Sequence, residues 1–174
     1  MNTVAELPFA LASEERLHRL DQRFAVAISG LHTRLEQLLQ SRSFTYLEKP
    51  VRLPTSVVYL FSENGTPLYV GRTNNFSQRL GNHCRAGSKA NQSSFAFKLA
   101  REAAGITEAA YTGDATRDAL MMRPEFLAGF TAAKKRLNVM QIRFVEECDQ
   151  VQQALLEIYC AVALKTSFNQ FGTH

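Results

Sequence analysis

The chain has 174 residues, 45% of them hydrophobic, and a formal net charge of +4. This length can bury one core, so we expect one compact domain with a helical extension and not two independent domains. No apolar run approaches the roughly 18 residues of a membrane-spanning helix, and the N-terminus does not resemble a secretory signal, so we expect a cytoplasmic protein with no membrane partner. Cys84, Cys148 and Cys160 are odd in number and lack metal-ligand spacing, which predicts reduced packing residues.

Residues 13–40 have the apolar spacing of a long amphipathic helix. Ser13 is a suitable N-cap, and Gly30 marks a position where the helix could break into two. The apolar stripe predicts either packing against the same domain, which we favour, or a homodimer seam, because this spacing is compatible with both. The stripe consists of Leu17, Leu20, Phe24, Ile28, Leu31, Leu35 and Leu38.

Two strand-like segments follow a proline-containing connector. The first, SVVYLFS at 56–62, is rich in β-branched and aromatic residues, and the second covers 68–71. The pair Asn64-Gly65 between them is a strong hairpin signal. We therefore predict that Tyr59 and Tyr69 lie on paired antiparallel strands.

The rest of the chain is predicted to be mainly helical, with one further strand. Polar residues at 73–75 can cap a helix over 76–84, and a second helix is expected over 93–104. Alternation over 139–145 predicts the third strand, and a closing helix is expected over 150–165. The predicted fold class is α+β, with a small three-stranded antiparallel sheet flanked by helices.

These elements suggest two parts of the chain. Residues 1–48 are expected to form an N-terminal helical extension, and residues 49–174 the main domain. Helical fragments at about 106–137 are interpreted as an insertion into that domain.

One segment of the chain concentrates positive charge. From Asn64 to Arg101 the sequence has no Asp or Glu. A local field of this sign attracts phosphates even though the whole chain is close to balanced. The cations of this segment are Arg72, Arg79, Arg85, Lys89, Lys98 and Arg101.

The hairpin and the segments after it resemble one known family. Val58-Tyr59-Leu60 and Tyr69-Val70-Gly71 are similar to the two half-motifs of the GIY-YIG nuclease superfamily, although Val57 stands where the family name implies glycine. Five or six matching positions in order are a fairly specific signal. The residues that follow in the superfamily's order are Arg79, His83, Glu157 and Asn169.

The resemblance covers roughly residues 56–170 and implies a metal-dependent endonuclease that hydrolyses phosphodiester bonds in DNA, with Mg²⁺ or Mn²⁺. Such hydrolysis requires a group that orients or deprotonates water, a cation for the phosphoryl oxygens, and usually a divalent metal. We expect the catalytic residues to be Tyr59, Tyr69, Arg79, His83 and Glu157. We expect substrate contacts from Gly71, Arg72, Arg85, Lys89 and Asn169.

The resemblance and residue chemistry together suggest a role for each catalytic residue. Tyr59 is expected to act as the general base or relay to it, with its pKa lowered by positive charge from Arg79 and His83. Arg79 is expected to bind the scissile phosphate, and His83, one helical turn later, to hydrogen-bond a tyrosine or the attacking water. Glu157 is the expected metal ligand, because a lone carboxylate among apolar residues is costly unless it is paired or metal-bound. Asn169 is expected to support that site.

Several alternatives stay open at this level. Glu146, Glu147 and Asp149 compete with Glu157 for the metal role. A catalytically weak or inactive nucleic-acid-binding module of the same fold would bind DNA in a salt-sensitive way without metal-stimulated cleavage. The helix at 13–40 offers a third role, in protein interaction. No recognisable DNA-reading motif separates a restriction role from a repair role.

Overall fold

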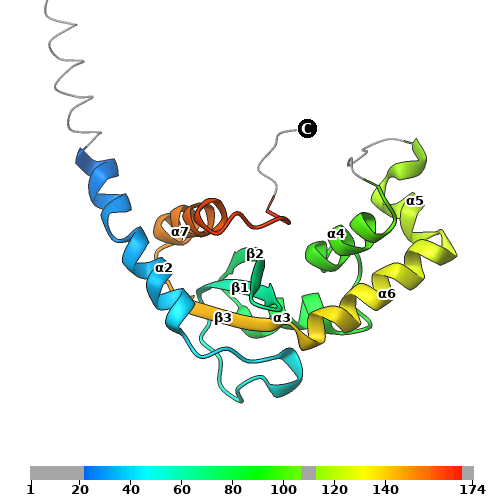
Figure 1. The fold of residues 1–174 in the computed structure, drawn as a ribbon, viewed down its shortest axis with the longest axis horizontal. Helices are drawn as coiled ribbons and strands as arrows, with labels where there is room; N and C mark the ends of the chain where they lie inside the picture. Colours follow the sequence, from blue (N-terminus) through cyan, green and yellow to red (C-terminus); the bar gives the residue numbers. More distant parts are fainter. Residues whose placement is uncertain (1–21, 107–112, 170–174) are drawn as a thin grey trace, which may run out of the picture.

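The structure is a computed structural model that describes residues 22–106 and 113–169 (Figure 1). It contains a three-stranded antiparallel sheet flanked by helices, which confirms the predicted α+β class. Residues 22–29 are helical and lead to a turn at Gly30. The elements that follow are α2 (Leu31–Gln40), η1 (Tyr46–Glu48), β1 (Val57–Glu63), β2 (Thr66–Thr73), α3 (Phe76–Cys84), α4 (Ser94–Ala103), η2 (Gly113–Ala115), α5 (Arg117–Met121), α6 (Pro124–Val139), β3 (Gln141–Glu146) and α7 (Gln150–Ala163).

The hairpin of β1 and β2 forms as the sequence predicts. Asn64 and Gly65 have φ angles of 50° and 79°, the left-handed values that a two-residue hairpin turn of type I′ requires. The register shifts by one residue between Phe61 and Ser62, and beyond this irregularity Phe61 pairs with Tyr69 and Tyr59 pairs with Gly71. The second strand is longer than predicted, so Gly71 lies inside β2 and does not end it.

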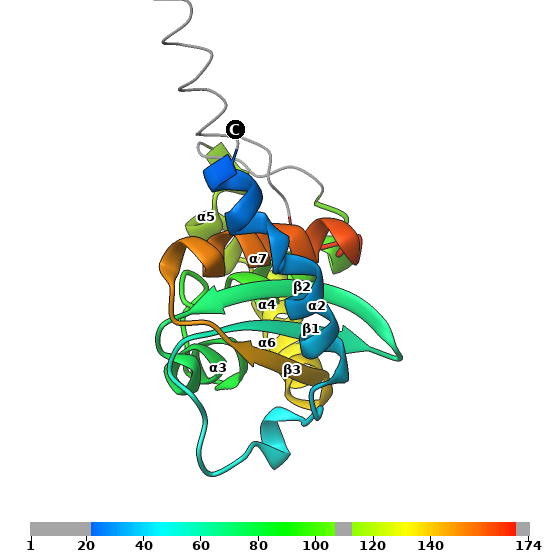
Figure 2. The same cartoon turned by 90° about the vertical axis from the view of Figure 1, so that its left-hand side faces the viewer.

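The sheet has the order β2-β1-β3, and helices cover both of its faces (Figures 1 and 2). One face carries the aromatic side chains of β1 and β2 and packs against α3, α4 and α6. The other face carries Val58, Leu60 and Val70 and packs against α2 and α7. Since β1 is central and both of its faces are buried, its sequence is a nearly continuous apolar run.

The N-terminal helical segment is part of this core. Leu31, Leu35 and Leu38 of α2 are buried in the same cluster as the second face of the sheet. Phe24 and Ile28, which the sequence placed on the same apolar stripe, are exposed, and Leu17 and Leu20 lie outside the described residues. The favoured interpretation, packing against the same domain, is therefore right for α2, and the helix is interrupted at Gly30 as anticipated.

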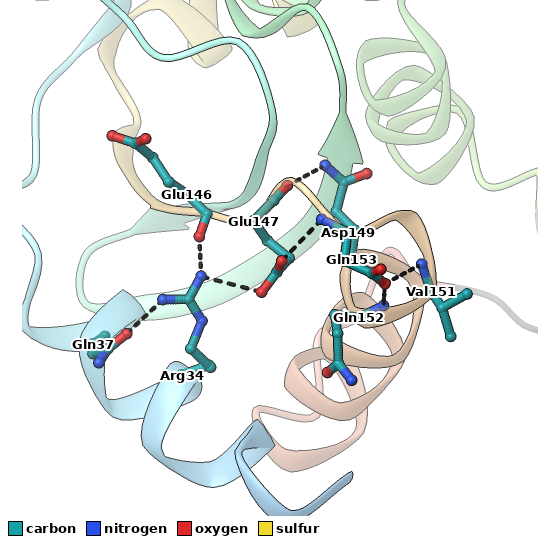
Figure 3. A network of polar contacts seen from close by, with 8 residues as sticks. All are labelled: Arg34, Gln37, Glu146, Glu147, Asp149, Val151, Gln152 and Gln153. Carbon is teal, nitrogen blue, oxygen red and sulfur yellow. Dashed lines mark hydrogen bonds and ion pairs between the residues drawn. The ribbon is translucent and has the colours of Figure 1, made fainter. Parts of the chain in front are cut away.

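A polar network fixes α2 to the beginning of α7 (Figure 3). The Arg34 guanidinium donates to the Gln37 side chain at 2.8 Å, to the Glu146 carbonyl oxygen and to the Glu147 carboxylate at 3.2 Å. The Asp149 carboxylate caps α7 by accepting the Val151 and Gln152 amides. The network thereby orients α7, the helix that carries Glu157.

α5 and α6, which lie mostly within the predicted insertion, also contribute to the core. Phe126, Phe130 and Leu137 of α6 are buried against the aromatic face of the sheet. The Lys134 ammonium group is buried and donates to the Arg85, Ala86 and Ser88 carbonyl oxygens. α6 therefore supports the loop between α3 and α4.

Two further expectations concern the cysteines and the membrane. Cys84 and Cys160 are buried packing residues, as predicted, but the prediction is wrong for Cys148, which is exposed on the loop after β3. Within the described ranges, no helix has both the length and the apolarity to cross a membrane.

Candidate active site

The hydroxyl group of Tyr59 is the centre of the candidate site. Tyr59 lies on the central strand and is fully buried. Its Oη accepts a hydrogen bond from Arg79 Nε at 3.0 Å and lies 2.9 Å from His83 Nε2. Arg79 and His83 are four residues apart on α3, so both side chains reach Tyr59 from one face of that helix, as the spacing predicts.

The His83 imidazole is enclosed by aromatic rings. Its ring centroid lies 5.5 Å from that of Phe61, 5.8 Å from that of Tyr69 and 6.4 Å from that of Phe95. Burial and the nearby Arg79 guanidinium hold the His83 pKa well below its usual range, so the ring is neutral at pH 7. Its Nδ1 has no hydrogen-bond partner among the described residues.

The expected activation of Tyr59 by positive charge is wrong in this structure. Burial raises the pKa of Tyr59 above its ordinary value, and the opposing effect of Arg79 is smaller. His83, being neutral, adds no positive charge. Tyr59 is therefore a neutral phenol at pH 7, because full burial penalises the phenolate more than one guanidinium stabilises it.

Tyr69 occupies a less enclosed position on the edge strand. Its ring stacks on Phe95 with centroids 4.7 Å apart, and the residue is 8% exposed, whereas Tyr59 is 0% exposed. Its hydroxyl interacts electrostatically with Arg79. Both phenols therefore converge on one guanidinium, and Tyr69 is the one nearer to solvent.

The outer nitrogens of Arg79 make two long hydrogen bonds to the segment at the start of α4. Nη1 donates to the Gln92 carbonyl oxygen at 3.3 Å and Nη2 to Ser94 Oγ at 3.4 Å. Contacts of this length are weak and are exchanged at low cost for a phosphate oxygen. Gln92 and Ser94 were not predicted from the sequence, where their one signal is a position at the beginning of α4.

Glu157 lies on α7 within electrostatic range of the Arg79 guanidinium. Its carboxylate accepts a hydrogen bond from Arg72 Nε at 3.0 Å, and the two form an ion pair. Burial raises the pKa of Glu157, while Arg72 and Arg79 act to lower it. Arg72 thus contacts the carboxylate that the sequence proposed as a metal ligand, a pairing that residue spacing does not reveal.

The donor chemistry at Glu157 fits a hard divalent cation. Mg²⁺ is commonly held by one or two carboxylates together with waters and substrate phosphates. Within the described ranges no group of three His, Cys, Asp or Glu side chains comes together, so a cage made only of protein ligands is absent there. Of the competing acids, Glu147 pairs with Arg34 and Asp149 caps α7, while Glu146 is exposed.

The predicted substrate contacts divide into two groups. Arg72, Arg85 and Lys89 are exposed. Asn169 instead bonds to the backbone of the edge strand: its Oδ1 accepts the Val70 amide at 2.8 Å, and its Nδ2 donates to the Val70 carbonyl oxygen at 2.8 Å. Asn169 therefore completes the hydrogen bonding of β2 next to Tyr69.

Gly71 leaves room for the central phenol. A Cβ atom at this position would lie 2.4 Å from Tyr59 Oη and 2.5 Å from Tyr59 Cζ. Such distances do not occur between real atoms, so only glycine allows the Tyr59 ring to lie across β2.

A comparison with known protein families supports a nuclease-type fold. The family model described as the GIY-YIG catalytic domain matches residues 55–167, which include β1, β2, α3 and nearly all of the segment up to Asn169. No curated protein and no solved structure gives a match.

Proposed function

Because the chain belongs to the GIY-YIG nuclease superfamily, we propose that it is a divalent-metal-dependent endonuclease that hydrolyses phosphodiester bonds in DNA. The observation that carries this proposal is the contact of Arg79 with the Tyr59 hydroxyl group. His83 contacts the same hydroxyl group, and Glu157 lies within electrostatic range of Arg79. A fixed cation beside a phenol and a carboxylate provides the groups that phosphodiester hydrolysis requires. We assign residues 49–174 to the nuclease domain and 1–48 to an N-terminal segment.

In this mechanism Arg79 binds the scissile phosphate. Its Nε is held by Tyr59, so the guanidinium plane is fixed before substrate arrives. Nη1 and Nη2 exchange their long contacts for phosphoryl oxygens and stabilise the charge that grows there in the transition state.

The two phenols have different roles in this proposal. Tyr69 lies closer to solvent, and its hydroxyl hydrogen-bonds the attacking water. Tyr59 is fully buried and neutral, so it serves as a positioning residue. Its hydroxyl group holds Arg79, and His83 in turn holds that hydroxyl group. This assignment shifts the direct role from Tyr59, which the sequence hypothesis favoured, to Tyr69.

Two conservative variants separate these roles. Tyr69→Phe is expected to lower kcat about 10²-fold with little change in Tm, because it removes the hydroxyl that hydrogen-bonds the attacking water and keeps the ring that stacks on Phe95. Tyr59→Phe is expected to lower stability by about 1–3 kcal/mol as well, because buried donors and acceptors of Arg79 and His83 lose their partner. The measurements are single-turnover cleavage and thermal unfolding. Full kcat in Tyr69→Phe would return the direct role to Tyr59.

Glu157 is the residue proposed to hold the divalent cation. When bound, Mg²⁺ or Mn²⁺ lowers the pKa of a bound water and neutralises charge on the leaving oxygen. Arg72 keeps the carboxylate ionised and oriented toward the site despite burial. The carboxylate must be deprotonated to bind metal, so its raised pKa implies that metal affinity begins to fall at a higher pH than for an ordinary Glu.

The metal assignment predicts a change in cation requirement. Glu157→Gln is expected to raise the Mg²⁺ concentration for half-maximal cleavage by more than about tenfold. Arg72→Gln is the comparison, because it removes the ion pair and retains the carboxylate. Equal Mg²⁺ dependence in Glu157→Gln and the unmodified protein would assign Glu157 to the ion pair alone.

A cleavage screen tests the proposed function. Plasmid, duplex, flap, junction and single-stranded DNA are incubated with Mg²⁺ or Mn²⁺ and analysed for nicks. Cleavage that depends on metal and on Arg79 supports the endonuclease. Salt-sensitive binding of DNA without cleavage of any substrate would instead identify a binding module of the same fold.

A further inference from the structure

A cavity of about 330 Å³ lies at the C-terminal end of α4, away from the groups described above. Lys98, Arg101 and Glu102 of α4 line it from one side, and Ser167 and Phe168 from the segment after α7 line it from the other. The proposed chemistry uses none of these residues.

Arg101 is the unexplained residue of this cavity. The residue is only 9% exposed, and its buried Nε has no hydrogen-bond partner in the part of the chain that the structure describes. Among the described residues, its guanidinium makes no ion pair with any carboxylate. Burying a cation without an anion costs free energy that packing alone does not return.

The surroundings of Arg101 increase this positive charge. Lys98 donates through Nζ to the Phe168 carbonyl oxygen at 2.8 Å, which fixes a second cation at the cavity wall. Burial lowers the pKa of Lys98, and repulsion from Arg101 and Arg117 lowers it further. The acid of the cavity, Glu102, is exposed and also interacts with Arg136 on α6. The cavity is therefore lined by two cationic side chains, Lys98 and Arg101, and by one acidic side chain, Glu102.

We propose that this cavity binds a phosphate group, and that the phosphate belongs to the backbone of the DNA strand held at Arg79. The planar guanidinium of Arg101 suits two oxygens of one phosphate, and Lys98 adds a point charge. The assignment to DNA rests on the proposed nuclease function, whereas the anion site itself does not.

The geometry of α4 relates the two phosphate positions. Ser94, in the first turn of α4, contacts Arg79, and Arg101 follows seven residues later, which is about 10 Å along a helix axis. The rings of Tyr69, Phe95 and Phe168 connect the two positions, with neighbouring centroids 4.7 and 5.3 Å apart. A strand lying along α4 would reach both sites.

Thermal unfolding with inorganic phosphate tests the anion site without nuclease activity. At constant ionic strength phosphate is expected to raise the Tm of the unmodified protein clearly more than that of Arg101→Met, which has similar length and no charge and keeps only the Arg79 position for phosphate. Without phosphate, Arg101→Met is expected to be more stable by about 2–4 °C, because the unpaired charge is gone. A Tm response to phosphate that is equal in both proteins would overturn the site. If Arg101→Met does not fold, Arg101→Lys replaces it in the test. Its Tm is expected to rise with phosphate by less than the Tm of the unmodified protein.

Binding of a labelled DNA duplex in EDTA tests the assignment to DNA. Arg101→Met is expected to weaken binding about tenfold and to reduce the salt slope by about one phosphate contact. The matched control is Arg52→Gln, an exposed arginine on the loop between η1 and β1 that does not line the α4 cavity. Loss of the phosphate response with unchanged DNA affinity would overturn the DNA assignment in favour of a free phosphorylated ligand. Because no metal is present, a protein that fails to cleave still gives a valid result.

Discussion

Replacing Arg79 by alanine is expected to lower kcat for DNA cleavage by about 10³-fold, with a much smaller loss of DNA affinity. Loss of one transition-state donor costs about 10²–10³-fold in other hydrolases. Arg79 also supplies the Nε donor to Tyr59 and a contact to Ser94, so the variant loses an oriented phenol as well as a cation. Single-turnover cleavage and metal-free DNA binding measure the two effects separately.

Two further variants define the origin of that loss. Arg79→Lys keeps the charge but has neither the fork nor the Nε donor, so it should recover less than a tenth of the rate. Lys135→Ala removes an exposed cation from α6 and should leave kcat unchanged. A cleavage rate for Arg79→Ala within tenfold of the unmodified protein would contradict the assigned role.

The sequence predicted the elements that carry the site because its local signals agree with the tertiary structure. The Asn64-Gly65 turn joins β1 and β2 as an antiparallel pair, and α3 has the predicted bounds, with Asn75 as its N-cap. Once the hairpin and this helix are placed, the i, i+4 spacing of Arg79 and His83 brings both to the phenol of Tyr59.

What the sequence did not predict depends on long-range burial and pairing. The depth of Tyr59 depends on helices that enclose it from 76–84 and 94–103, and this depth reverses the expected direction of its pKa. The pairing of Arg72 with Glu157 joins residues that are 85 positions apart. Asn169 was expected to support the metal, but its amide matches the free backbone edge of β2 at Val70. No periodicity or motif encodes such contacts.

Replacing Gly71 by alanine is expected to reduce both stability and activity, although the change adds one methyl group. The new Cβ would lie 2.4 Å from Tyr59 Oη. The Tyr59 ring has little room to retreat, because its centroid is 5.5 Å from that of Phe76 and 5.9 Å from that of Phe61. Overpacking of this kind costs about 2–3 kcal/mol, or about 4–12 °C in Tm for a chain of this length. Thermal unfolding measures this loss.

The activity of Gly71→Ala follows from where the ring moves. Any shift that relieves the clash takes Tyr59 Oη away from Arg79 and His83, so kcat is expected to fall by at least about 10²-fold in single-turnover assays. The control is Gly129→Ala on α6, where an added Cβ meets nothing within 4 Å and helix propensity favours alanine. In the double variant with Tyr59→Phe, the hydrogen bonds are already lost, so Gly71→Ala should cost less than it does alone. Strict additivity of the two changes would mean that Gly71 acts independently of the phenol, and that the glycine in β2 serves the backbone instead of the site.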